Sequence, residues 1–123
     1  MSLEKINKTL IEFSDKHNLK QEAMKSCQIA MFNCILNDVD GLGGFKLTEI
    51  HLEFIKQDLI FQHYLSETPF IKTRIGLYKK EENDIYLRNL EPIGYYELDS
   101  DANGESFDDW LIIEVEKNKL KKD

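Results

Sequence analysis

The sequence predicts an α+β fold, in which two N-terminal helices pack on an antiparallel meander of about five strands. Two observations carry this prediction. Apolar residues recur at helical spacing up to about residue 36, and they alternate with polar residues over much of the chain after Gly44. Helices followed by a run of strands are typical of α+β domains. A chain of 123 residues has room for one hydrophobic core, so we expect one globular domain over residues 1–123.

The first helix is predicted over residues 3–16 and the second over residues 20–36. Ser2 is suited to cap the first helix, whose apolar residues follow at steps of three, four and three. These residues form one stripe: Leu3, Ile6, Leu10 and Phe13. In the second helix, the stripe from Ala23 to Cys34 is flanked by further apolar residues on the other sides. We therefore expect its C-terminal half to be deeply buried.

Residues 45–65 leave two interpretations open. As a single helix, the segment has an apolar stripe that breaks at Asp58. As a β-hairpin with Gln57-Asp58 as its two-residue loop, it gathers an almost wholly apolar set of side chains on one face. Gln-Asp is not a favoured hairpin turn. We adopt the hairpin, which predicts strands over residues 46–56 and 59–66.

Three further strands are predicted nearer the C-terminus. Apolar and polar residues alternate from Ile71 to Leu77, which indicates a strand over residues 70–79. Pro92 interrupts the next apolar stretch, which we interpret as a strand with a break over residues 85–98. The last strand is predicted over residues 109–116, with its apolar side chains pointing inward: Leu111, Ile113 and Val115.

The net charge of −7 is concentrated in one segment. Residues 89–116 contain no Lys or Arg, whereas the preceding part of the chain is nearly neutral and the last seven residues are basic. The segment holds nine acids: Glu91, Glu97, Asp99, Asp101, Glu105, Asp108, Asp109, Glu114 and Glu116. Nucleic-acid binding depends on neutralising phosphates, so we expect no nucleic-acid partner. A basic protein partner is electrostatically favoured.

Composition also predicts a cytoplasmic protein without a membrane partner. No apolar run approaches the roughly 18–20 residues that a membrane span needs, and charged residues interrupt the apolar pattern of the N-terminal segment. Cys27 and Cys34 lie seven residues apart on a predicted helix. Their Cα atoms would be about 10 Å apart, too far for a disulfide. Two free thiols are typical of a reducing compartment.

The sequence holds no recognisable catalytic motif, so we favour a non-enzymatic function and expect no cofactor. The cysteines lie on a buried stripe, and the three histidines have no zinc-ligand spacing. The alternative is a small-molecule-binding domain or enzyme with a pocket between the helices and the sheet. That pocket would use His63, Tyr64 or Arg74.

A second alternative is a weak divalent-cation loop. Residues 99–104 match the opening of a calcium-binding loop, in which Asp99, Asp101 and Asn103 would supply oxygen ligands. The match fails at its twelfth position, where Trp110 replaces the required Glu. We therefore interpret the segment as a polar hairpin loop and predict no metal site.

The hypothesis that we favour is a small, non-catalytic, acidic domain that binds a basic protein. Aromatic residues interleaved with acids are typical of protein-binding hot spots. The predicted partner-binding residues are Tyr95, Tyr96, Asp99, Asp101, Glu105, Phe107, Asp108, Asp109 and Trp110. In size, acidity and α+β pattern the chain resembles small bacterial immunity and antitoxin proteins. The resemblance implies an inhibitor that covers the basic active site of a toxic enzyme.

Overall fold

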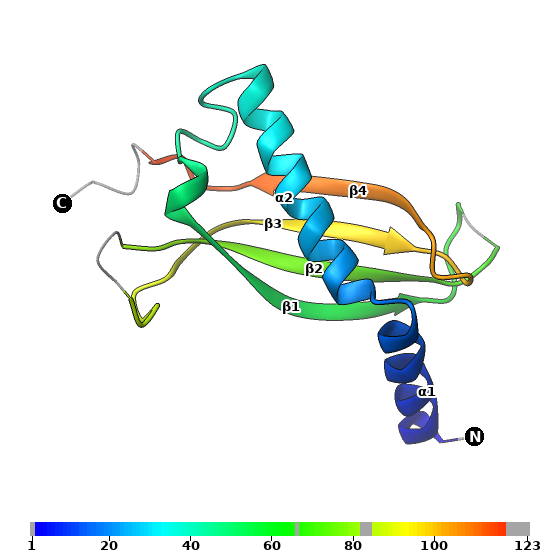
Figure 1. Cartoon of the computed structure of the whole chain (residues 1–123). Coiled ribbons are helices and arrows are strands. Elements are labelled where there is room, and N and C mark those ends of the chain that lie inside the picture. The colour runs from blue at the N-terminus through cyan, green and yellow to red at the C-terminus, as the bar shows by residue number, and fades with distance from the viewer. Residues whose placement is uncertain (1, 66, 82–84, 118–123) are drawn as a thin grey trace.

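The computed structural model describes residues 2–65, 67–81 and 85–117, and these form two helices followed by a four-stranded antiparallel sheet (Figure 1). The predicted α+β fold is confirmed, with four strands where about five were expected. The strands lie in the sheet in chain order, as in a simple meander. The elements are α1 (Leu3–Lys16), α2 (Leu19–Asn37), the short 3₁₀ helix η1 (Leu47–Glu49), β1 (Ile50–Ile60), β2 (Phe70–Lys79), β3 (Glu91–Ser100) and β4 (Ser106–Ile113).

Helix α1 has the predicted bounds, and its N-terminus is capped as expected. The Lys5 amide donates a 3.2 Å hydrogen bond to Ser2 Oγ. Asn18 then adopts a left-handed conformation (φ 54°), which turns the chain from α1 into α2. In Figure 1, α1 extends beyond the sheet, whereas α2 crosses its face. Neither helix, nor any other helical segment among the described residues, has the length and apolarity needed to cross a membrane.

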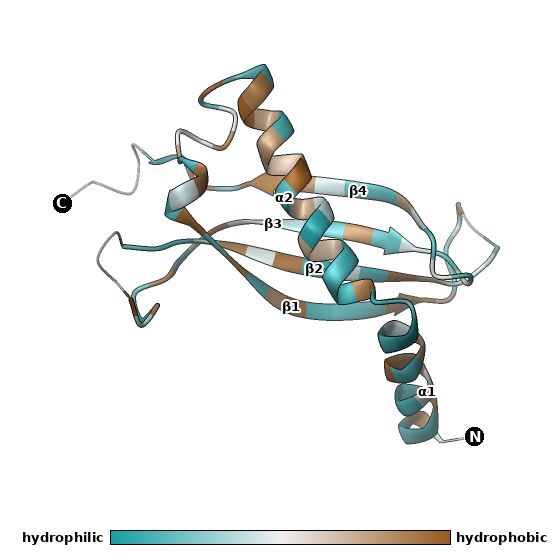
Figure 2. Ribbon diagram, viewed as in Figure 1, coloured by the Kyte–Doolittle hydropathy of each residue, from teal (hydrophilic) through white to brown (hydrophobic). Residues whose placement is uncertain are grey.

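Helix α2 covers one face of the sheet, which we call the covered face. Every fourth residue from Leu19 to Met31 is buried, because this spacing keeps one side of the helix against the strands. Figure 2 shows the matching hydrophobic bands on α2 and along the strands. The core consists of Ala23, Cys27, Met31, Leu42, Phe45, Ile50, Ile75, Leu77, Ile93, Tyr96 and Leu98.

The expectation that the C-terminal half of α2 is deeply buried is wrong. Phe32 is 52% exposed and Leu36 is 67% exposed, and Ile29 is exposed as well. The sheet packs against one side of α2 only, and no described element covers the opposite side. The apolar residues around this half of the helix therefore divide between the core and the surface.

The hairpin interpretation of residues 45–65 is also wrong. Strand β1 runs without a break through Gln57 and Asp58, which pair with Thr73 and Lys72 of β2. The predicted strand over residues 59–66 is therefore not a separate element, because its first residues complete β1. The Gln57 side chain donates hydrogen bonds to Ser14 Oγ (2.9 Å) and Thr73 Oγ1 (3.2 Å), so a polar residue is satisfied inside a strand.

The remaining strands occur near their predicted places. Strand β2 has the predicted bounds, whereas β3 begins later than the predicted residue 85 and β4 begins three residues before the predicted 109. Gly94 allows β3 and β4 to approach closely, because a Cβ atom there would collide with the carbonyl oxygen of Ile112. Between these strands, Gly104 takes a positive φ (80°) in the connecting loop.

Candidate functional site

The face of the sheet away from α2, which we call the open face, carries the charged side chains of β2 and β3. Side chains alternate along a strand, so Lys72 and Arg74 lie opposite the core residues of β2. The register places Arg74 beside Glu97 and Lys72 beside Asp99. The sheet topology therefore brings basic residues of β2 next to two members of the acidic segment.

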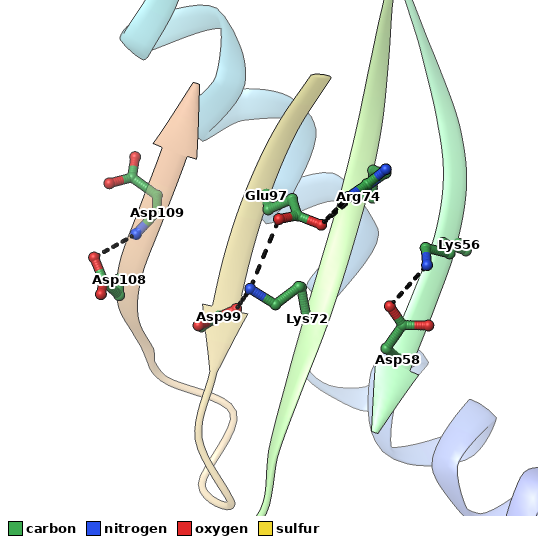
Figure 3. Close-up of polar contacts among 8 residues, drawn as sticks. All are labelled: Lys56, Asp58, Lys72, Arg74, Glu97, Asp99, Asp108 and Asp109. Atoms are coloured by element: carbon green, nitrogen blue, oxygen red, sulfur yellow. Dashed lines mark hydrogen bonds and ion pairs between the residues drawn. The ribbon is translucent and has the colours of Figure 1, made fainter. Parts of the chain in front are cut away.

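These four residues form one ion-pair network (Figure 3). Arg74 contacts Glu97 Oε2 through Nε at 2.9 Å and through a terminal nitrogen at 2.8 Å. Lys72 Nζ lies 3.7 Å from Glu97 Oε1 and 3.4 Å from Asp99 Oδ1. Glu97 is 9% exposed and Asp99 only 2% exposed, so both carboxylates are buried within the network. The basic residues of β2 therefore compensate the charges of Glu97 and Asp99.

Aromatic rings flank the same two cations. The Arg74 guanidinium lies 4.0 Å from the ring centroid of Tyr95, and Lys72 Nζ lies 4.3 Å from that of Trp110. Such cation–π contacts each contribute about 0.5–2 kcal/mol, depending on how well they exclude water. Tyr95 and Trp110 thus help to hold the side chains of the network in place.

A cavity of about 440 Å³ opens on this face, at the end of the sheet where β1 connects to β2. Its volume lies in the range typical of small-ligand sites, about 300–1,000 Å³. One wall is built from rings in contact: the centroid of Phe70 lies 5.8 Å from that of His63 and 5.5 Å from that of Phe107. The complete lining is Ile60, His63, Leu65, Phe70, Lys72, Asp99, Phe107, Asp108 and Trp110.

Asp99 is the least satisfied polar group at this cavity. Its Oδ1 atom accepts no hydrogen bond from the described residues, and the nearby Lys72 ammonium makes only an ion pair with it. Burial raises the pKa of Asp99, and the Lys72 charge opposes this shift only in part. A buried carboxylate oxygen without a hydrogen bond is costly, which marks it as a place where a ligand donor is favoured.

Asp109 points to the covered face of the sheet and has a different role from its neighbour Asp108. The Tyr96 hydroxyl donates a 2.8 Å hydrogen bond to Asp109 Oδ2. Burial, together with this bond, raises the pKa of Tyr96. Both residues line a shallow groove of about 490 Å³ between α2 and the last two strands. The other residues of this groove are Ser26, Ile29, Ala30, Asn33, Leu98, Ser106, Phe107 and Asp108.

The side chain of Asp101 organises the loop between β3 and β4. Asp101 Oδ1 accepts hydrogen bonds from the amides of Asn103 (2.9 Å) and Glu105 (3.0 Å). Asp99, the other carboxylate of the calcium-like motif, pairs with Lys72 on the open face. Within the described ranges, no group of three or more His, Cys, Asp or Glu side chains could hold a metal ion. The hairpin-loop interpretation therefore accounts for these residues.

The side chains considered for catalysis are dispersed. Burial raises the pKa of the Cys27 thiol to about 12, so that this thiol stays protonated and inert at neutral pH. His63 lies in the β1–β2 connection, where its ring stacks on Tyr64, which is largely exposed. Arg74 is engaged by Glu97. The structure thus places His63 at a cavity of the open face, not in a pocket between the helices and the sheet.

The predicted partner-binding residues divide into three groups. Tyr96 and Asp99 are buried, so neither side chain lies on the outer surface. Tyr95 and Asp101 are partly buried and engaged within the chain. The exposed members are Glu105, Phe107, Asp108, Asp109 and Trp110, which lie together on β4 and the residue before it.

Sequence reasoning missed the residues that complete the site from other strands. Lys72 was recognised only as a polar position of an alternating strand, Arg74 was considered only for a pocket between the helices and the sheet, and Phe70 was not considered. Their alternation did place Lys72 and Arg74 on one face. Their pairing with Glu97 and Asp99 depends on the register between β2 and β3, which the sequence pattern does not reveal.

Comparison with known proteins adds no assignment: no protein-family model matches the chain, and neither a curated protein nor a solved structure matches it. The case for a function rests on the geometry of these residues.

Proposed function

We propose that this protein is a non-catalytic binding domain that recognises a basic surface of another protein. The contact is made by the acidic edge, which we define as Asp101, Glu105, Phe107, Asp108, Asp109 and Trp110. The observation that carries the proposal is the composition of β4, an edge strand that exposes two adjacent carboxylates beside two large rings. An edge strand that exposes apolar side chains is a typical interaction site.

The charge distribution supports the same location. Lys72 and Arg74 compensate the inner carboxylates Glu97 and Asp99. Of the seven other acids in this segment, four lie on β4 and in the loop before it: Asp101, Glu105, Asp108 and Asp109. Carboxylates at the rim of an interface accelerate association with a basic partner. Phe107, 56% exposed, and Trp110, 40% exposed, supply ring surface that a partner can bury.

An inhibitor of the immunity or antitoxin type is the form of this function that we favour. Such an inhibitor covers the basic active site of a toxic enzyme, which calls for a small, acidic and rigid surface. The acidic edge has these properties, because the Asp101 loop and the β3–β4 pairing hold it in place.

The test compares two variants that change the net charge equally. Glu105→Lys with Asp108→Lys reverses two charges of the acidic edge, and Glu12→Lys with Asp15→Lys does the same on exposed residues of α1. Asp109 is left intact, because it accepts the Tyr96 hydrogen bond. A partner is first isolated on the immobilised wild-type chain at low salt and eluted with salt. Its purified form is then titrated against the three proteins by calorimetry.

We expect the acidic-edge variant to weaken binding by a factor of about 100 or more, and the α1 variant by less than about 5. Association of the wild-type protein should also slow steeply with added salt. If both variants lost affinity for the partner equally, the loss would reflect net charge alone and not the acidic edge. Normal binding by a folded acidic-edge variant would contradict the proposal.

A second candidate function is small-molecule binding, and the cavity beside His63 is the observation that favours it. The cavity combines four rings with charged groups, which is typical of ligand sites. Thermal-shift screening of the wild-type protein against amines, carboxylic acids and nucleotides tests this candidate. A stabilising ligand whose effect is lost in His63→Ala would support it, and no shift with any class would count against it.

A further inference from the structure

The cavity beside Asp99 has an excess of negative charge. Three charged residues line it, and Lys72 is one cation against the carboxylates of Asp99 and Asp108. Lys72 also contacts Glu97, which Arg74 compensates, so among the described residues Asp108 is the lining carboxylate for which no ion pair is found. A positively charged ligand would therefore balance the site, whereas an anion would meet two carboxylates.

The most buried carboxylate of the cavity lining, that of Asp99, has one oxygen for which the described part of the chain supplies no hydrogen bond. Asp99 is only 2% exposed, yet its Oδ1 atom accepts no hydrogen bond from the described residues. A carboxylate oxygen can only accept, so its partner must be an N–H or O–H group. A ligand that suits this position carries a positive charge and ends in a group that donates hydrogen bonds.

The walls of the cavity favour a flat cation over a compact one. His63, Phe70 and Phe107 form a continuous series of rings, and Trp110, next to Lys72, also lines the cavity. A guanidinium group is planar, weakly hydrated and able to stack on rings while it donates to carboxylates. An ammonium group loses more hydration on entering such a site.

We infer that this cavity takes one arginine side chain of the basic partner, with Asp99 as the buried acceptor and Asp108 as a carboxylate at the rim. The inference rests on the proposed function and adds to it a specific anchor. The cavity and the acidic edge share Phe107, Asp108 and Trp110, so an arginine inserted there would lie within the same interface.

The test uses the fluorescence of Trp110, which is the only tryptophan of the chain and lines the cavity. The probe is N-acetyl-arginine methylamide, which represents an arginine side chain within a peptide. N-acetyl-citrulline methylamide is the matched uncharged probe. We expect a saturable change in emission with the arginine probe, and binding at least about tenfold weaker with the citrulline probe.

Two variants with the same change in charge complete the test. Asp99→Asn removes the buried acceptor charge and should weaken binding of the arginine probe by about tenfold or more. Asp58→Asn is the control, because Asp58 pairs with Lys56 on the open face and is not part of the cavity lining. It should bind the probe as the wild-type protein does. If Asp99→Asn folds poorly, the comparison of the two probes on the wild-type protein still tests the inference.

Three outcomes would overturn the inference: equal binding of the two probes, unchanged binding in folded Asp99→Asn, or binding of free arginine but not of its capped form. The last would assign the cavity to a free amino acid. Failure here is distinguishable from failure of the proposed function. Loss of partner binding on reversal of Glu105 and Asp108, without a response to the arginine probe, would retain the acidic edge and reject the arginine site.

Discussion

The Tyr96 hydroxyl donates a 2.8 Å hydrogen bond to the Asp109 carboxylate, and this bond joins a fully buried ring of β3 to the edge strand β4. Asp109 is therefore both an exposed carboxylate and a structural partner of the core. Within the part of the chain that the structure describes, its neighbour Asp108 has no such link, and its side chain accepts a hydrogen bond from the Asp109 amide alone (2.9 Å; Figure 3). Two adjacent acids that look equivalent in the sequence thus have different effects on stability.

The first prediction concerns this hydrogen bond. Tyr96→Phe and Asp109→Ala should each lower the free energy of unfolding by about 1–2 kcal/mol, since a bond to a charged acceptor is lost. The double variant should lose less than the sum, because both changes remove the same bond. Asp108→Ala, the control, should cost less than about 0.5 kcal/mol at this exposed position. Urea unfolding of the four variants measures the coupling, and strict additivity would show that the bond contributes nothing.

The second prediction concerns Asp99 and pH. Because the pKa of Asp99 is raised in the folded protein, ionisation of this group destabilises the fold as pH increases past the ordinary pKa of an aspartate. Asp99→Asn removes this destabilisation. The melting temperature of the variant relative to the wild-type protein should therefore be higher at pH 7 than at pH 3. A relative melting temperature that falls between pH 3 and pH 7 would contradict the raised pKa.

The third prediction has the opposite sign. A 2.8 Å hydrogen bond from Lys117 lowers the pKa of Glu49, so the ionised Glu49 stabilises the fold above the pKa that it has in the unfolded chain. This contribution is lost as pH falls through the lowered pKa. Glu49→Gln should therefore reduce the melting temperature at pH 7 and match the wild-type protein at strongly acidic pH. Thermal unfolding monitored by circular dichroism across this range tests the prediction, and a pH-independent difference would refute it.

The fourth prediction concerns the contact between β3 and β4. In Gly94→Ala, the added methyl group would collide with the backbone carbonyl oxygen of Ile112, so the strands must separate. We expect a loss of about 3 kcal/mol in the free energy of unfolding. Gly76→Ala is a useful control, because its methyl group meets side-chain atoms of Ile55 and Tyr78, which can move more easily than backbone atoms, so it should cost less. Similar losses in the two variants would argue against the close backbone contact.

The elements that could be predicted are those in which the periodicity of apolar residues is uninterrupted. Helix α1 and strand β2 have the predicted bounds, because a single periodicity runs through each of them. Strand β1 was divided in two because a hairpin with Gln57-Asp58 as its loop would gather apolar side chains on one face. In the structure these polar groups are satisfied by Ser14, Thr73 and Lys56, residues that come from α1, β2 and β1 itself.

The sequence predicted the candidate site correctly only for some of its exposed side chains. Phe107 and Trp110 were expected at the surface and are exposed. Tyr95 and Tyr96 were both assigned to that surface, although adjacent strand residues point to opposite faces. The burial of Asp99 was not predicted, because its neutralising partner, Lys72, lies 27 positions earlier in the sequence and reaches it only through the register of β2 and β3.

The hydrogen bond within the Asp108–Asp109 pair has a consequence for how copies of this chain meet one another. The Asp109 amide is occupied by the preceding carboxylate, so it is not offered to a strand that approaches β4. Two copies aligned edge to edge would also bring four like charges together. Growth of an extended fibre along this edge is thereby disfavoured, even though the same strand displays two large rings to solvent.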